Sequence, residues 1–241
     1  MLKKILQKYR EGELASSVKE RIRFDVYLPA RRFMNLVSDW YYHIDTENIA
    51  SLDSLGVPAD SGERYESTPA SEFNAVMKSF NISPQDTFLD MGCGKGRTAL
   101  LAGKYPFRKI IGVDISGILV KIAEHNVRSM QSRLRCKQYE FITSNAASYD
   151  IPADISYVYF FNPFPYHIMS KVMDNIRVSF EKSPRRITII YYNPKYAEQL
   201  EQDPYLNLID KMEFNHFSLY KSRCNIYDYG TSYPGISPSE V

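Results

Sequence analysis

Short apolar runs alternate with amphipathic stretches from residue 87 to residue 201, and this alternation limits the fold more than any other feature of the chain. The runs have the length of strands and are apolar almost throughout, which is typical of strands buried on both faces of a parallel sheet. The predicted strands cover residues 87–91, 109–114, 138–143, 154–161 and 186–192. The predicted helices cover residues 97–104, 116–129, 166–180 and 194–201.

Two further runs, residues 206–215 and 217–229, have the pattern of a β-hairpin that turns near Asn215-His216. Strand–helix alternation predicts an α/β fold with a doubly wound, mainly parallel sheet and helices on both faces. The C-terminal antiparallel hairpin would bring this sheet to seven strands. We expect residues 65–241 to form this domain and residues 1–64 to form a helical and loop N-terminal extension.

A helix is predicted directly before the first strand. Thr68 suits its N-cap and Pro69 its first helical position. Apolar residues then recur at helical spacing, which predicts a face packed on the core. These residues are Phe73, Val76, Met77 and Phe80.

The N-terminal segment is more basic than the rest of the chain. The 241 residues carry a formal charge of only +2, which gives no global argument for a nucleic-acid or membrane partner. Residues 1–33, however, hold nine basic and four acidic residues. Apolar residues at helical spacing in this segment predict one or two amphipathic helices. Such helices could present a solvated face, or a basic surface for an anionic substrate, an acidic lipid or a nucleic acid.

Cysteine usage and the apolar runs indicate the compartment. Cys93, Cys136 and Cys224 are odd in number and widely spaced, so neither a disulfide framework nor a zinc cluster is predicted, and no metal site is expected. A reducing, cytoplasmic location fits this pattern. The first ten residues contain no uninterrupted apolar stretch, so we expect no secretory signal. The longest apolar runs, around residues 155–161 and 187–192, are far shorter than a membrane span, so we expect none.

A glycine-rich turn joins the first predicted strand to the next helix, in Phe88-Leu-Asp-Met-Gly-Cys-Gly-Lys-Gly-Arg97. Gly92, Gly94 and Gly96 lack Cβ atoms, so the backbone can bend sharply and approach a ligand closely. The helix that follows offers free N–H groups at its N-terminus. The G-x-G-x-G spacing differs from the G-x-G-x-x-G of dinucleotide-binding proteins, which argues against a nicotinamide oxidoreductase.

Two acidic residues accompany the turn. Asp90 stands two residues before Gly92, and Asp114 ends the next predicted strand, 22 residues after Gly92. A carboxylate in the position of Asp114 can accept hydrogen bonds from both hydroxyls of a ribose. Asp114 also suits a helix N-cap, and the two roles are compatible.

Together, Asp90-Met-Gly-Cys-Gly-Lys-Gly96 and Ile111-Gly-Val-Asp114 resemble the motifs of the class I S-adenosyl-L-methionine (SAM)-dependent methyltransferases. Some bacterial members share more detail, including a Tyr-x-x-Thr-Pro lead-in (residues 65–69 here), the Gly-Lys-Gly-Arg turn and an Asn-Pro-Phe motif. The resemblance implies a methyltransferase domain at residues 65–241. It also implies SAM as the cofactor and S-adenosyl-L-homocysteine as the product.

The resemblance implies a role for each matching residue around the turn. Asp90 would hold the methionine amino group, directly or through water. The three glycines would let the turn wrap the methionine moiety. Asp114 would hold the ribose, and Ile115 would pack on the adenine.

Residues elsewhere complete the implied cofactor site. Asn145 and Ala146 match the place where many members have Asp-Ala, so Asn145 would meet the adenine amino group. A simple turn residue is the alternative for Asn145. The lead-in residues Tyr65 and Thr68 would fold over the methionine end of the cofactor.

The fourth predicted strand ends in Phe160-Phe161-Asn162-Pro163-Phe164-Pro165. Ligands of open α/β sheets lie beyond the carboxyl ends of the strands, so this segment should face the transferable methyl group. Asn162 could orient an incoming amine and contact the cofactor, Pro163 rigidifies the turn, and the ring of Phe164 attracts positive charge. The segment resembles the Asn-Pro-Pro-Tyr/Phe motif of amino-group methyltransferases, with Phe in place of the second Pro. A strand-terminating turn without a chemical role is the alternative.

These patterns predict an active methyltransferase, with an amine on a protein (a lysine or the N-terminus) as its acceptor. A sugar or other small metabolite is the next alternative, and nucleic acid is a less favoured one. A non-catalytic SAM-binding protein on the same fold is the alternative from a different functional class.

Overall fold

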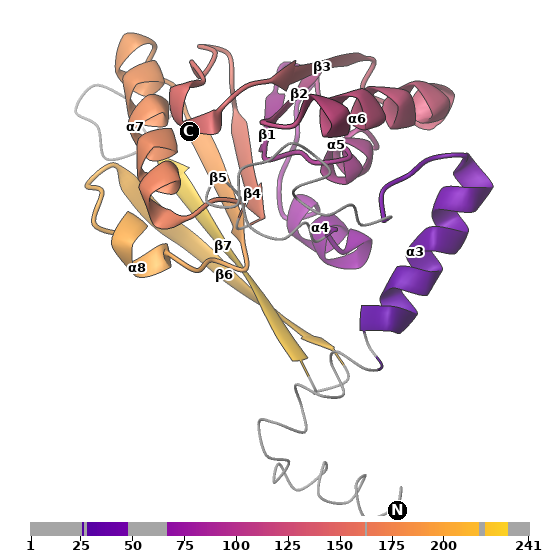
Figure 1. The fold of residues 1–241 in the computed structure, drawn as a ribbon. Helices are drawn as coiled ribbons and strands as arrows, with labels where there is room; N and C mark the ends of the chain where they lie inside the picture. The colour runs from indigo at the N-terminus through magenta and orange to yellow at the C-terminus, as the bar shows by residue number, and fades with distance from the viewer. Residues whose placement is uncertain (1–25, 27, 48–66, 162, 217–219, 231–241) are drawn as a thin grey trace, which may run out of the picture.

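The computed structural model describes residues 26, 28–47, 67–161, 163–216 and 220–230, and a seven-stranded sheet lies at the centre of this part of the chain (Figure 1). The strand order is β3-β2-β1-β4-β5-β7-β6. Strands β1 to β5 pair in parallel, and β7 runs antiparallel to both β5 and β6. The strands are β1 (Thr87–Met91), β2 (Lys109–Asp114), β3 (Gln138–Thr143), β4 (Tyr157–Phe161), β5 (Ile187–Tyr192), β6 (Leu206–His216) and β7 (Tyr220–Tyr229). The α/β fold class predicted from the sequence is confirmed.

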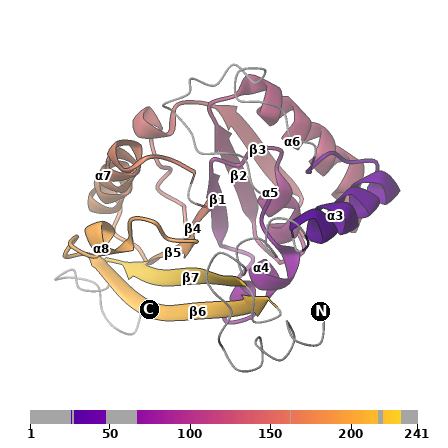
Figure 2. The same ribbon diagram turned by 60° about the horizontal axis from the view of Figure 1, so that its bottom comes forward.

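Helices cover both faces of the sheet, with α4, α5 and α6 on one side and α7 and α8 on the other (Figure 2). Residues of β1 and β5 are buried throughout, which explains why these strands read as continuous apolar runs. The α-helices are α3 (Leu28–Tyr42), α4 (Ala70–Met77), α5 (Arg97–Ala102), α6 (Gly117–Met130), α7 (Tyr166–Lys182) and α8 (Ala197–Leu200). The short 3₁₀ helices are η3 (Gln131–Arg133) and η4 (Ala146–Ser148).

One local prediction is wrong, and another is slightly misplaced. Thr68 does not cap α4, because that helix begins at Ala70 with Pro69 as its N-cap and no side-chain hydrogen bond there. The hairpin turn, predicted near Asn215-His216, comes after these two residues, because both belong to β6 and pair with Lys221 and Tyr220. In each case the pattern located the element correctly but misplaced its end by one or a few residues.

Several predictions fall on residues outside the described part of the chain. They include the N-terminal amphipathic helices, Tyr65 and Asn162. The structure also contains a helix that the sequence pattern did not predict, α3, which lies beside α5 and α6 (Figure 2). Among the described residues, no helix combines the length and the apolar character that a membrane span needs.

Candidate functional site

The glycine-rich turn lies at the carboxyl end of β1 and leads into α5. Gly92, Gly94 and Gly96 have φ angles of 82°, 52° and 77°, in the left-handed region that favours glycine. The N–H groups of Gly92 and Cys93 donate to the carbonyl oxygen of Val113, at 2.8 and 3.0 Å. These bonds hold the turn against the end of β2, as a ligand-binding turn at the edge of a parallel sheet requires.

The lack of a side chain at two of these glycines also allows close packing within the protein. A Cβ atom on Gly92 would lie 2.6 Å from the Cβ of Pro163, in the turn after β4. A Cβ atom on Gly96 would lie 2.8 Å from the Cβ of Ala123, on α6. The turn therefore closes tightly on two neighbouring elements.

Asp90 is a buried acid with an unsatisfied oxygen. It lies near the end of β1 and is 2% exposed. Its Oδ2 atom has no hydrogen-bond partner among the described residues. Burial, together with the negative charge of Asp114, raises the pKa of Asp90 from its usual 3.8 to about 8. A cationic donor placed beside this oxygen would satisfy it and favour its ionised form.

Asp114, at the end of β2, accepts hydrogen bonds from the turn. Its Oδ2 accepts from the N–H of Gly94 and its Oδ1 from the N–H of Ser116, both at 2.9 Å. Burial raises the pKa of Asp114, against these backbone hydrogen bonds, which lower it. The N-cap of α6 is Ser116, whose side chain accepts from the N–H of Leu119, so the alternative of Asp114 as the N-cap is wrong.

The predicted adenine-binding residues follow β2 and β3. Ile115 is 36% exposed, whereas Ala146 is buried in the core. Asn145 is the N-cap of η4, because its Oδ1 accepts from the N–H of Ala147 at 2.9 Å. Asn145 therefore acts as a turn residue, with a carbonyl oxygen that retains a second lone pair.

The Asn-Pro-Phe segment follows β4. Pro163 contacts the glycine turn as described, and the ring of Phe164 lies 3.6 Å from the position of a Cβ on Gly92. Phe164 is 8% exposed and packs in the core with residues of α7, such as Met169. The structure thus gives Phe164 a packing role, and its role toward an acceptor stays a prediction.

Thr68 lies against the other side of the sheet from α7. Its hydroxyl group is within hydrogen-bond distance of Thr98 Oγ1 on α5 (3.0 Å) and of the Tyr159 hydroxyl on β4 (3.1 Å). Tyr159 lies opposite Asp90 in the β1–β4 pair. Thr68 is therefore connected to β4, the strand that pairs with β1 at Asp90.

Residues 88–178 match the family model described as a methyltransferase domain. This match covers β1 to α7, the part of the chain that holds the glycine turn and both acids. This stretch of the chain is therefore similar to methyltransferase domains.

Curated relatives of this domain include two ribosomal protein L11 methyltransferases. The protein from Thermotoga maritima is 22% identical over 145 residues, which are 59% of this chain and 49% of the relative. The protein from Caldicellulosiruptor bescii is 30% identical over 70 residues, which are 29% of this chain and 23% of the relative. The chain thus spans about half the length, or less, of the curated relatives that it matches.

Solved structures show that the chain shares its fold with SAM-dependent methyltransferases. An RNA methyltransferase from Salinibacter ruber, in complex with S-adenosyl-L-homocysteine, aligns with a TM-score of 0.52 and 15% identity. The alignment covers 71% of this chain and 98% of that one. A SAM-dependent methyltransferase from Aquifex aeolicus aligns with a TM-score of 0.52 and 14% identity, over 66% of this chain and 89% of that one.

The acids at the ends of β1 and β2 have the chemistry to fit SAM. The cofactor carries an ammonium group, a ribose with two hydroxyl groups and a flat adenine ring. The unsatisfied buried oxygen of Asp90 suits the ammonium group, and Asp114 suits the ribose. Among the described residues, no group of His, Cys, Asp and Glu side chains is arranged to hold a metal ion.

Two basic residues of the turn have a structural role that our sequence reasoning did not assign. Lys95 is 3% exposed and forms an ion pair with Asp45, its Nζ lying 2.8 Å from Oδ2. Arg97 donates to the carbonyl oxygen of Thr68 and to side chains of the segment that ends at residue 47. In the sequence, the only indication of such a role was the position of both residues in the Gly-Lys-Gly-Arg stretch.

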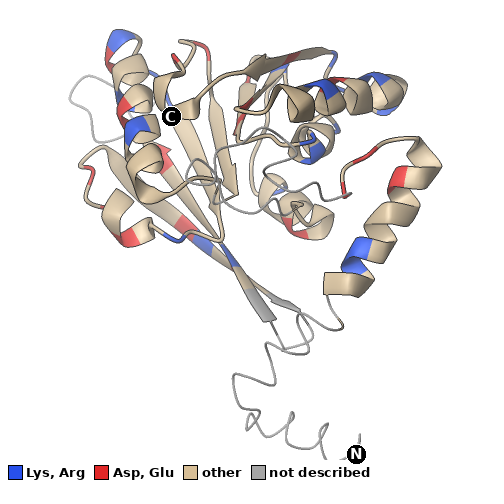
Figure 3. Ribbon diagram, in the orientation of Figure 1, with Lys and Arg blue, Asp and Glu red and all other residues tan. Residues whose placement is uncertain are grey.

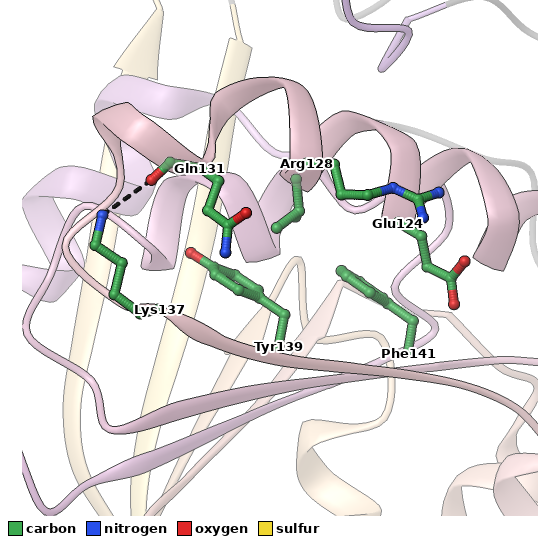
Figure 4. A pocket seen from close by; sticks show the side chains of 7 residues that line it. Glu124, Arg128, Gln131, Lys137, Tyr139 and Phe141 are labelled. Atoms are coloured by element: carbon green, nitrogen blue, oxygen red, sulfur yellow. Dashed lines mark hydrogen bonds between the residues drawn. The ribbon is translucent and has the colours of Figure 1, made fainter.

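A cavity of about 270 Å³ lies between α6 and the edge strand β3 (Figure 4). The rings of Tyr139 and Phe141 line it side by side, with centroids 6.4 Å apart and planes within 9° of parallel. Arg128 and Glu124 of α6 lie across from these rings. None of the predicted cofactor residues lines this cavity, so it is separate from the candidate site.

Proposed function

We propose that this chain is a SAM-dependent methyltransferase that methylates an amine on a protein, either a lysine side chain or an N-terminus. The observation that carries the proposal is the pair of buried acids at the ends of β1 and β2. Asp90 has an oxygen without a hydrogen-bond partner among the described residues, and Asp114 accepts a hydrogen bond from the glycine turn. A site for an ammonium group and a ribose needs acids in these two positions.

In this proposal the cofactor is held from three sides. Asp90 binds the methionine amino group and Asp114 binds the ribose, while Gly92, Gly94 and Gly96 shape the turn around the methionine moiety. Ile115, Ala146 and Asn145 surround the adenine. Tyr65, Thr68 and Asn162 contact the methionine end of the cofactor. We also propose that this chain belongs to the bacterial subgroup with the Gly-Lys-Gly-Arg and Asn-Pro-Phe motifs.

When bound, SAM supplies a methyl group that the sulfonium already activates, so the protein mainly orients the acceptor. The acceptor nitrogen must present a free lone pair, which means that a lysine has to lose its proton first. We propose that Asn162 holds the amine through its side-chain oxygen and that Pro163 fixes the direction of the turn. Phe164 supports this turn from the core.

The preference for a protein acceptor has two supports. The motif after β4 resembles that of amino-group methyltransferases, and the curated relatives are named for a ribosomal protein as their substrate. Because the match covers about half of those relatives, it supports the acceptor class but not the particular protein. RNA methyltransferases among the similar structures support the fold alone at 15% identity.

Transfer of a labelled methyl group from SAM into an extract of the source organism that lacks this gene would test the proposal. Wild-type protein is compared with Asp114→Ala, and with Asp150→Ala as a control at an exposed acid outside the site. The products are then separated by protease, by nuclease and by size. We expect labelling by the wild type and the control, but not by Asp114→Ala, in material that protease removes.

Other outcomes would redirect the proposal. Label in nuclease-sensitive material would assign a nucleic-acid acceptor, and label in small or carbohydrate material would assign a metabolite or a sugar. SAM binding without label in any fraction would favour a non-catalytic binding protein. Equal labelling by wild type and Asp114→Ala would contradict the cofactor site itself.

A further inference from the structure

Lys95 ties the glycine turn to a segment 50 residues earlier in the chain. Its Nζ lies 2.9 and 2.8 Å from the two carboxylate oxygens of Asp45. Asn126 on α6 holds both partners, because its Nδ2 donates to the carbonyl oxygens of Asp45 (2.8 Å) and Lys95 (2.9 Å). The Oδ1 atom of Asn126 also accepts from the N–H of Asp45 at 2.9 Å. The turn, α6 and the segment before residue 48 therefore meet at one point.

Arg97, two residues further on, binds the same segment with two of its nitrogens and Thr68 with the third. Its Nε donates to the carbonyl oxygen of Thr68 at 3.0 Å. Nη1 donates to Thr46 Oγ1 at 2.8 Å and Nη2 to Asn35 Oδ1 at 2.7 Å. The rigid, planar guanidinium group can satisfy three separate acceptors at once, which a lysine cannot do in the same geometry.

Acidic residues also form hydrogen bonds within the segment of residues 35–47 that Lys95 and Arg97 bind. Figure 3 shows acidic positions at the end of α3 and in the stretch that follows it. The carboxylate of Asp39 accepts from the hydroxyl group of Thr46 at 2.9 Å and from the N–H of Glu47 at 3.1 Å. Glu47 in turn accepts from the side chains of Asn35 and Ser67. Both carboxylates lie 3.9 Å from Nη1 of Arg97.

We call this network the clasp, and it consists of Asn35, Asp39, Asp45, Thr46, Glu47, Lys95, Arg97 and Asn126. Most of its members are buried; Asp39 is 4% exposed, Thr46 0% and Glu47 6%. Buried charges are costly unless they are paired in good geometry, so the network fixes one arrangement of the turn and the segment. A surface ion pair would not impose such an arrangement.

The clasp acts on the peptide groups that form the cofactor site. Lys95 lies between Gly94, whose N–H group donates to Asp114, and Gly96, which is the N-cap of α5. Arg97 holds the backbone of Thr68, whose hydroxyl group contacts Tyr159 beside Asp90. Movement of either basic side chain would shift the groups on both sides of the cofactor.

We propose that Lys95 and Arg97 are positioning residues, which hold residues 35–47 and Thr68 against the glycine turn so that the turn has its cofactor-binding shape. The identity of the cofactor rests on the proposed function. Coupling of this kind is reciprocal: if the clasp strengthens cofactor binding, the bound cofactor stabilises the clasp by the same factor.

Binding of S-adenosyl-L-homocysteine to the full chain, measured by titration calorimetry, tests the proposal. Asp45→Asn removes the charge partner of Lys95, and Arg97→Lys removes the fork of three donors. The exposed pair of Arg108 and Asp154 provides matched controls, Asp154→Asn and Arg108→Lys. We expect each clasp variant to bind at least about fivefold more weakly, and each control to stay within about twofold of the wild type.

Hydrogen exchange on the unmutated protein supplies an independent readout, which remains usable if a clasp variant does not fold. Added S-adenosyl-L-homocysteine should slow exchange in residues 35–47. Unchanged exchange there, or folded clasp variants with wild-type affinity, would overturn the inference while the wild type still bound the ligand. Failure of the wild type to bind the ligand would instead overturn the proposed function.

Discussion

A Cβ atom on Gly92 would lie 2.6 Å from the Cβ of Pro163, so the glycine turn and the turn after β4 are in direct contact. The two sequence motifs that these residues represent therefore form one packed unit at the carboxyl ends of β1 and β4. Phe164 lies in the core directly behind the same glycine.

Gly92→Ala should destabilise the protein by at least about 2 kcal/mol, because alanine is disfavoured at a φ of 82° and its methyl group would overlap Pro163. Gly117→Ala is the matched control, since a Cβ there would meet only Thr143 atoms at 3.5 Å or more, at the first position of α6. Urea denaturation measures both. Equal stability of the two variants would contradict the close contact.

Cofactor binding should release a proton below pH 8. The pKa of Asp90 is raised to about 8 by burial and by Asp114, so the acid is largely protonated at neutral pH before the ammonium group arrives. An ammonium group beside it would favour the ionised form. Affinity for SAM should then rise with pH by up to about tenfold per unit until pH 8. Calorimetry in buffers of different ionisation enthalpy measures the proton, and Asp90→Asn should abolish the release.

The stability of the ligand-free protein should fall as the pH rises from about 5 to 8.5. The folded protein holds a proton on Asp90 up to a pKa of about 8, whereas the unfolded chain loses it near the usual value of 3.8. Asp90 therefore contributes stability that is fully present below pH 3.8 and is lost as the pH passes 8. The slope from this group is at most about 1.4 kcal/mol per pH unit. Denaturation of Asp90→Asn across this range should show a flatter profile.

Phe164 should behave as a core residue in a stability measurement. Phe164→Ala should cost about 3–5 kcal/mol, because the side chain is 8% exposed and packs with α7. Phe164→Leu keeps much of the apolar volume and should cost less. If Phe164 also faces the acceptor, the leucine variant will raise the KM of the acceptor and leave the affinity for S-adenosyl-L-homocysteine unchanged. A stable Phe164→Ala variant would contradict the core position.

The strands and the glycine turn were accessible to sequence reasoning because their signals are local. The predicted bounds of β1, β2 and β3 agree with the structure. The first residue of α4 was harder to predict from the sequence. Thr68 has the residue type of an N-cap, but its hydroxyl group binds Thr98 and Tyr159, on elements 30 and 91 residues away. Such tertiary contacts leave no periodic pattern.

The clasp was not accessible from the sequence for the same reason. Asp45 lies in a polar stretch that resembles an ordinary loop, and its partner Lys95 is 50 residues away. Around the glycine turn, the resemblance implied cofactor roles for Asp90 and the three glycines but none for Lys95 or Arg97. The structure instead pairs Lys95 and Arg97 with the N-terminal side of the chain. The division of the chain at residue 65 stays a prediction, because residues 48–66 lie outside the described part.

Titration of SAM into wild-type protein and into Asp114→Ala is the most direct test of the cofactor site, on which the proposed function depends. The account predicts binding of one SAM per wild-type chain and an affinity at least about tenfold lower for the variant, with no binding of NAD by either protein. Asp114→Ala should retain a cooperative unfolding transition. Wild-type affinity in a folded Asp114→Ala variant, or no binding of SAM by the wild type, would contradict the assignment of this site.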